Sequence, residues 1–147
     1  MIFGNIFKRF WVSLSLLTLC GLVLCGCTER KDLETALYAV VLENLRAATE
    51  EDIDAYVDTM HSDAPTYQQT QQLTKQVFAT HDLKYETHVF RYVEQDGDYA
   101  IARLEFSTTR IAGPEFKDNR LDTFHIFCKE NGQWKIWSQV TLTVKYL

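Results

Sequence analysis

The stretch KENGQWKI, residues 129–136, decides the fold of this chain. It contains Asn131-Gly132, a dipeptide typical of two-residue hairpin turns, whose central residues need a positive φ. After the turn, apolar and polar residues alternate almost to the end of the chain, which is the period of a β-strand. The stretch therefore predicts an antiparallel hairpin that joins strands over residues 120–129 and 133–146.

A second hairpin signal, Asp96-Gly97, lies closer to the N-terminus. It separates predicted strands over residues 84–94 and 99–110. A longer connection that contains Gly113-Pro114 joins the second strand to the third. Because every connection is short, the four strands are expected to form an antiparallel meander.

Alternation assigns faces to the second and fourth strands. In the second strand Ala100, Ala102, Leu104 and Phe106 are small or apolar and are expected to face the core. The even set of the last strand, which includes Ser138, is expected to face one way in the same manner. Ile101 and Trp137 belong to the wetter faces and indicate an outer apolar patch that pairs two copies of the chain. The third strand is apolar on both sides, so the sequence leaves the direction of His125 open.

Three helices are predicted before the strands. Residues 33–48 repeat apolar side chains every three or four positions, and this helix is expected to begin at Asp32. Thr49 and the three acids after it predict the capped start of a second helix, which ends near His61. Pro65 then suits the first turn of a third helix over residues 65–80. The fold class expected is α+β, a roll of three helices packed on a curved four-stranded antiparallel sheet.

The beginning of the chain resembles a bacterial lipoprotein export signal. Lys8 and Arg9 precede a largely apolar run over residues 10–24, which is shorter than the roughly 20 residues of a membrane-spanning helix. Three cysteines lie nearby, and only Cys27 follows a small residue, Gly26, as the lipobox of lipoproteins requires. Residues 1–26 are therefore predicted to be a signal peptide.

Lipidation of Cys27, with palmitate-type acyl chains, would hold the protein on a membrane. Residues 27–31 are then a short lipidated tether and residues 32–147 a single domain. The predicted location is the bacterial cell envelope. Thr28 resembles the residue that follows the lipidated cysteine in outer-membrane lipoproteins, which indicates the periplasmic face of that membrane if the cell is Gram-negative.

Charge and cysteine content narrow the possible partners. Without residues 1–26 the chain has 13 basic and 20 acidic side chains, a formal charge of −7, which argues against nucleic acid as a partner. Besides Cys27, only Cys128 remains, so no internal disulfide is expected. The domain should be stabilised by packing, with Cys128 as a small buried residue on a strand.

Several motifs together resemble the nuclear transport factor 2-like superfamily, in its polyketide-cyclase-like branch. They are the order of the elements, the helix break HSDAP at residues 61–65, the hairpin DGDYA at residues 96–100 and KENGQWKI. The resemblance covers residues 32–147 and implies a cone-shaped cavity between the sheet and the helices. Some members are isomerases, dehydratases or cyclases, others bind small hydrophobic ligands, and others mediate protein contacts, so the resemblance predicts a fold rather than one function.

Catalytic candidates are few, and no catalytic residue is assigned. An acid–base enzyme needs a proton acceptor in a dry pocket; His61 with Asp63 is one candidate pair and His125 beside Thr123 is another. No Asp or Glu falls on the inner set of the second or fourth strand, which weakens the enzyme hypothesis. The four histidines lack metal-ligand spacing, so neither a metal nor a cofactor is expected.

The sequence favours a membrane-tethered envelope lipoprotein whose noncatalytic domain binds a small apolar ligand or a protein, with a homodimer through the outer sheet face. The alternative is a small acid–base enzyme of the isomerase, dehydratase or cyclase type that uses His61 in the cone. Candidate ligand-binding residues are Tyr56, His61, Tyr67, Phe106 and Ser138. Convergence of His61 with a carboxylate in the cavity would favour the enzyme.

Overall fold

The computed structural model describes the backbone of residues 18–147 and the side chains from Glu29 onward. The predicted signal peptide therefore lies largely outside the described residues, and so does the side chain of Cys27. The chain divides into two compact units, residues 1–35 and 36–147, and the boundary falls within the first helix. No helix in the described part of the chain is long and apolar enough to span a membrane.

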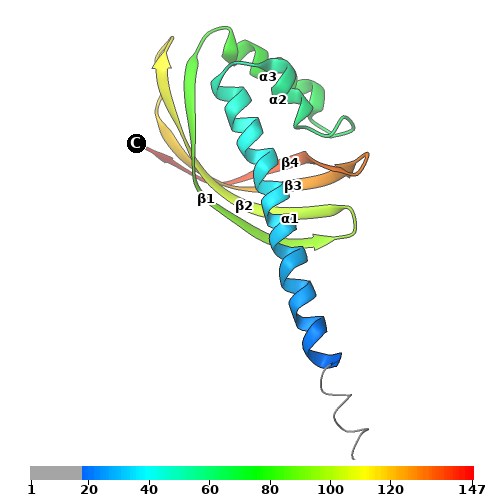
Figure 1. Ribbon diagram of the computed structural model, residues 1–147. Coiled ribbons are helices and arrows are strands. Elements are labelled where there is room, and N and C mark those ends of the chain that lie inside the picture. Colours follow the sequence, from blue (N-terminus) through cyan, green and yellow to red (C-terminus); the bar gives the residue numbers. More distant parts are fainter. Residues whose placement is uncertain (1–17) are drawn as a thin grey trace, which may run out of the picture. The chain divides into compact units, whose positions relative to one another are not determined.

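Three helices precede four strands, and the strands form one antiparallel sheet in the order β1-β2-β3-β4 (Figure 1). The predicted α+β class and the meander are confirmed. The elements are α1 (Thr18–Thr49), α2 (Ile53–Asp58), α3 (Tyr67–Phe78), β1 (Asp82–Asp96), β2 (Tyr99–Ala112), β3 (Asn119–Glu130) and β4 (Gln133–Tyr146).

The start of α1 and the cap of α2 differ from the sequence prediction. Residues 27–31, expected to be a tether, are helical within α1. None of them is Pro or Gly, so no helix-breaking residue separates them from the helix predicted to begin at Asp32. Thr49 does not cap α2; it is the last residue of α1, and its hydroxyl donates to the carbonyl of Leu45 at 2.9 Å. Asp52 is the cap, because its carboxylate accepts the backbone N–H of Ala55 at 3.0 Å.

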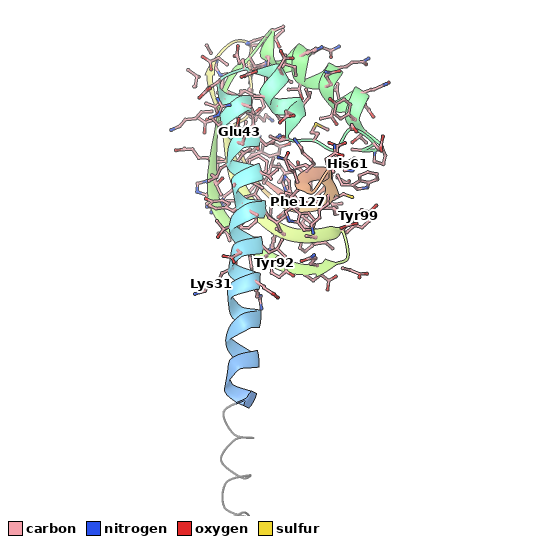
Figure 2. The ribbon with its side chains drawn as sticks, turned by 45° about the vertical axis from the view of Figure 1, so that its right-hand side comes forward. Lys31, Glu43, His61, Tyr92, Tyr99 and Phe127 are labelled. Carbon is pink, nitrogen blue, oxygen red and sulfur yellow. The ribbon has the colours of Figure 1, made fainter. Side chains whose placement is uncertain are left out.

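The core of residues 36–147 lies between α1 and the concave face of the sheet (Figure 1). The even-numbered residues of β2 are buried at positions 100–108, as predicted for 100–106, whereas Arg110 and Ala112 at the end of the strand are exposed. Phe127 on β3 is fully buried beside them, and Figure 2 shows it between the helix and the sheet. The buried apolar residues of α1 are Leu37, Val41, Leu45, Ala47 and Ala48.

Two irregularities in the pairing of β3 with β4 break the alternation that the sequence predicts for β4. The register shifts between Ile126 and Phe127 and again between Asp122 and Thr123. As a result Ser138 pairs with Ile126 on the outer face, whereas Gln139 pairs with His125 on the inner face. The prediction that the even-numbered residues of β4 share one face is therefore wrong, because each bulge reverses the side on which the next residues lie.

The first bulge coincides with a contact from the helical layer. After α2 the chain runs alongside β4, and Met60 forms a parallel bridge with Ile136. Two backbone hydrogen bonds fix this contact, from His61 N–H to the Ile136 carbonyl at 2.9 Å and from Ile136 N–H to the Thr59 carbonyl at 2.8 Å. His61 therefore belongs to an extended segment at the sheet edge rather than to the end of a helix.

Candidate functional site

A cavity of about 170 Å³ lies between the three helices and the concave face of the sheet; we call it the inner cavity. A second space of about 410 Å³, the outer cavity, adjoins it toward the C-terminal end of β4. The two share Val77, Tyr85 and Phe106 in their walls, so they are neighbouring compartments. The other residues of the inner wall are Asn44, Leu45, Ala48, Tyr56, Leu73, Thr74, Phe78, His125 and Gln139.

His125 is the ionisable side chain of β3 that faces the inner cavity. It pairs with Ala102 of β2 and Gln139 of β4, and only 4% of its surface is exposed. Burial lowers the pKa of His125 to about 4, because an apolar setting disfavours the charged imidazolium. At neutral pH its ring is therefore uncharged.

Two tyrosines and an asparagine add polar groups to the inner cavity. Burial raises the pKa of Tyr56, and the polar side chains of Thr74 and Asn44 beside its hydroxyl partly offset that rise. Burial also raises the pKa of Tyr85, to about 12. Both phenols therefore stay protonated and neutral over the physiological range.

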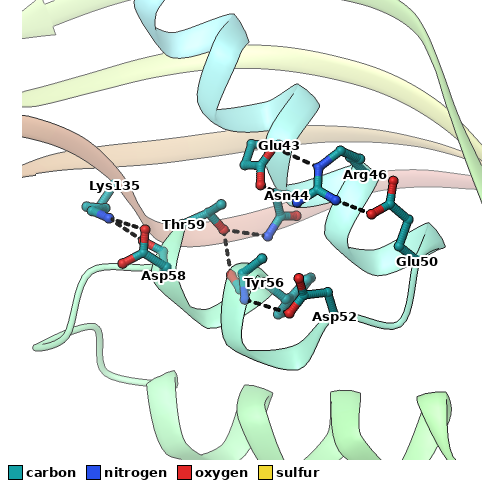
Figure 3. A network of polar contacts seen from close by, with 10 residues as sticks. Glu43, Asn44, Arg46, Glu50, Asp52, Tyr56, Asp58, Thr59 and Lys135 are labelled. Atoms are coloured by element: carbon teal, nitrogen blue, oxygen red, sulfur yellow. Dashed lines mark hydrogen bonds and ion pairs between the residues drawn. The ribbon is translucent and has the colours of Figure 1, made fainter.

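Asn44 connects α1 to the segment that follows α2 (Figure 3). Its amide donates to the hydroxyl of Thr59 at 2.7 Å, and that hydroxyl donates to the carbonyl of Tyr56 at 2.7 Å. Since Asn44 and Thr59 are both buried, this chain of hydrogen bonds holds the end of α2 in place under the cavity.

No charged side chain takes part in the walls of either cavity, as far as the described residues show. The ionisable groups that do are two histidines and three tyrosines. Among the described side chains, from Glu29 onward, no cluster of three His, Cys, Asp or Glu side chains could hold a metal ion. Chemistry that depends on a carboxylate in the cavity has no support from this arrangement.

The histidine and acid proposed as a catalytic pair lie elsewhere. The Nδ1 atom of His61 accepts the backbone N–H of Asp63 at 3.1 Å, so the contact between the two does not involve the carboxylate. The ring packs edge-on against Trp137, with centroids 4.9 Å apart, and lies 3.7 Å from a carboxylate oxygen of Glu130. His61 lies at the side of the domain (Figure 2), against Trp137, whose ring also contacts that of Tyr99, and it lines neither cavity.

Of the other predicted ligand-binding residues, some line the inner cavity and some do not. Tyr56 and Phe106 line the inner cavity together with His125. Tyr67 and Ser138 line neither compartment, and Ser138 faces outward for the reason given above. Sequence reasoning missed Asn44 and Tyr85. Asn44 had a signal, because it is a polar residue within the broad apolar face of a helix.

Residues 39–147 match the family model described as "Anti-sigma-I factor RsgI9, C-terminal domain". The chain belongs to this RsgI9 C-terminal domain family. The match covers both cavities and all four strands. No curated protein is similar enough in sequence to match.

Solved structures extend the likeness of this RsgI9-family domain to the nuclear transport factor 2-like fold. A candidate dehydratase of that family from Streptomyces avermitilis has a TM-score of 0.63 at 11% identity, over 75% of this chain and 94% of the other. A protein of the same family of unknown function from Pseudomonas putida has a TM-score of 0.61 at 13% identity, over 74% and 84%. At these identities the likeness establishes the fold alone.

Proposed function

We propose that the domain binds a small, uncharged and largely apolar molecule in the inner cavity without transforming it. The observation that carries this proposal is that a concave, mostly apolar space is lined, among the described residues, by a few neutral polar groups and no charged side chain. A histidine with a pKa of about 4 is also a poor proton acceptor at neutral pH, because it is a weak base.

The RsgI9 family description names an anti-sigma factor, and this supports a regulatory role. We infer that occupancy of the cavity is the signal that such a domain passes on. To report a molecule outside the cytoplasm, such a domain has to stay at the cell envelope. The N-terminal segment, as the proposed membrane anchor, would keep the ligand-binding domain there.

The proposed tether is a lipid on Cys27, after cleavage behind Gly26. The basic pair, the apolar run and the small residue before Cys27 support it. Metabolic labelling with an alkynyl palmitate analogue tests the proposal in the bacterium. Label is expected on the wild type and on Cys25→Ser, and it should be absent from Cys27→Ser. An unlabelled wild type, or label that persists in Cys27→Ser, would contradict lipidation at this position.

A homodimer through the outer face of the sheet is the proposed assembly. That face places Ile101, Ile126 and Ser138 in one row and Arg103, Phe124 and Val140 in the next. Val140 is 49% exposed, so apolar surface remains uncovered there.

The alternative, an acid–base enzyme that uses His61, finds less support in the geometry. His61 lines neither cavity, and one of its ring nitrogens is engaged by the Asp63 backbone. The relatives described as candidate dehydratases share only the fold with this chain.

Filling the inner cavity tests the proposed function. Ala48 is buried and lines the cavity, so Ala48→Leu adds volume where the ligand is expected. Ala79→Leu, on the exposed end of α3, is the matched control. The full-length variants would be purified from their own membrane and the retained small molecules analysed by mass spectrometry. A compound that accompanies the wild type and the control but not Ala48→Leu is expected; equal amounts in all three would contradict the proposal.

A further inference from the structure

The hydrogen bonds around His125 determine which of its ring nitrogens carries the proton. The hydroxyl of Thr123 lies 3.1 Å from the carbonyl of Leu104 and donates its one hydrogen to it. The same hydroxyl oxygen lies 3.3 Å from Nδ1 of His125. Because its hydrogen is already used, the oxygen can only accept from that nitrogen, so Nδ1 carries the hydrogen.

The other ring nitrogen, Nε2, is then a lone-pair acceptor. Its proton is absent because the neutral ring carries only one, and burial keeps the ring neutral by lowering the pKa of His125 to about 4. No hydrogen-bond partner for Nε2 occurs among the described residues. Among the described side chains, Nε2 is not one of the fully buried polar atoms that lack a hydrogen-bond partner. It is therefore accessible, and the space it faces is the inner cavity, which His125 lines.

We propose that Nε2 of His125 is the acceptor for a hydroxyl group of the bound molecule, and that the ligand is an uncharged alcohol or phenol with an apolar body. This inference rests on the proposed function and adds the ligand class. An accessible acceptor in a buried site requires a donor, since an unmatched polar group there costs free energy. A carboxylate ligand is disfavoured for two reasons. Its oxygen lone pair would face the lone pair of Nε2, and its charge would find no cationic side chain in the described walls.

The apolar body of the ligand has a defined direction. From the inner cavity the space continues past Val77, Tyr85 and Phe106 into the larger outer cavity. The additional walls there include Leu83, Phe116 and Leu121. A ligand whose hydroxyl lies at His125 therefore extends its ring or chain toward the open end of the sheet, where aromatic side chains favour an aromatic body.

Three probes of one shape test the proposal: 4-phenylphenol, biphenyl and biphenyl-4-carboxylate. Their binding to the full chain in lipid nanodiscs would be measured by equilibrium dialysis against empty nanodiscs. One hydrogen bond corresponds to a preference of about five- to tenfold, so the wild type should bind 4-phenylphenol more tightly than biphenyl by that factor. The carboxylate should bind most weakly.

Two substitutions of His125 separate the contribution of its hydrogen bond to binding from that of the apolar cavity walls. His125→Leu should bind biphenyl and 4-phenylphenol equally, whereas His125→Gln, whose amide oxygen can accept a hydrogen bond near the same place, should keep part of the preference. His88→Leu is the matched control, because His88 also contacts a hydroxyl, that of Ser107 at 3.0 Å, but lines neither cavity. It should keep the full preference.

The outcomes distinguish the two levels of the proposal. Equal binding of biphenyl and 4-phenylphenol by the wild type, a preference that survives in His125→Leu, or tightest binding of the carboxylate would each overturn the assigned ligand class and leave a binding cavity in place. Failure of all three probes to bind the wild type would overturn the proposed function as well.

Discussion

His125 is a buried base that the folded domain keeps neutral, and this affects stability as well as binding. In the unfolded chain a histidine has a pKa near 6.5. In the folded domain burial lowers the pKa of His125 to about 4. Between these values the unfolded state binds more protons than the folded state, so stability rises with pH through this window and falls as pH decreases.

We therefore predict that the wild type is less stable at pH 5 than at pH 7, by about 2 kcal/mol in free energy of unfolding. In His125→Leu this difference should be largely absent. Urea denaturation of both proteins at the two pH values measures it. The acids Glu130 and Asp122, whose pKa values are lowered chiefly by bonds to Ser62 and Arg103, lose their contributions only at lower pH. An equal pH dependence in the two proteins would contradict the neutral, buried ring.

The residues of the site show what sequence could and could not reveal. Tyr56 and Phe106 were predicted because each falls on the apolar face of a strongly patterned element. The direction of His125 was open, because β3 is apolar on both sides and only its pairing with Ala102 assigns it to the inner face. His61 was selected from its place near a helix end, but a short parallel bridge fixes that segment to β4 at the edge of the sheet.

At the scale of elements, a buried hydrogen bond joins Asn44 of α1 to Thr59, the residue that follows α2 (Figure 3). We predict that Asn44→Leu destabilises the domain by about 1–3 kcal/mol, because it removes the buried bond to the Thr59 hydroxyl. Glu43→Gln, one residue away on α1, should leave the free energy of unfolding unchanged within error, since the bond of Glu43 to Arg46 is exposed. Urea denaturation compares the two. Equal effects would contradict the role given to Asn44.

The connection between β2 and β3 depends on a glycine. At Gly113, φ is +98°, and a Cβ atom there would lie 2.4 Å from the carbonyl oxygen of Thr80. Gly113→Ala should therefore cost about 2–4 kcal/mol.

Gly97 provides the control, because its φ is also positive but, its chain neighbours apart, no atom of the described residues lies within 4 Å of the added Cβ. Gly97→Ala should cost only about 1–2 kcal/mol, the price of the backbone conformation. Thermal denaturation of both variants measures the difference. A Gly113→Ala domain as stable as Gly97→Ala would show that the connection can move away from the end of α3.

Element boundaries in the strands were largely predictable, because turn dipeptides and alternation mark them. The two bulges in the pairing of β3 with β4 were not, since no Gly or Pro in β4 signals either shift. The cap of α2 was misassigned because Thr49 and Asp52 both have capping side chains. Glu51, with φ of 58°, provides the turn that ends α1 before Asp52.

At the scale of the whole molecule, the outer sheet face is the surface proposed for the homodimer. Two ion pairs lie on this face, Arg103 with Asp122 at 2.5 Å and Arg120 with Glu105 at 3.3 Å, next to the exposed apolar rows. We predict that Ile126→Glu halves the protein mass found for the wild type by light scattering in detergent, because a charge opposes burial of that row. Lys75→Glu, at an exposed position of α3 away from the sheet, should leave the mass unchanged. A monomeric wild type would contradict the dimer.

A structure of the full chain determined with 4-phenylphenol bound tests the central claim most directly. The account predicts the phenol ring system in the two cavities, with its oxygen about 2.8 Å from Nε2 of His125, within hydrogen-bond range. A probe bound outside these cavities, or one inside them with its hydroxyl directed away from His125, would contradict it.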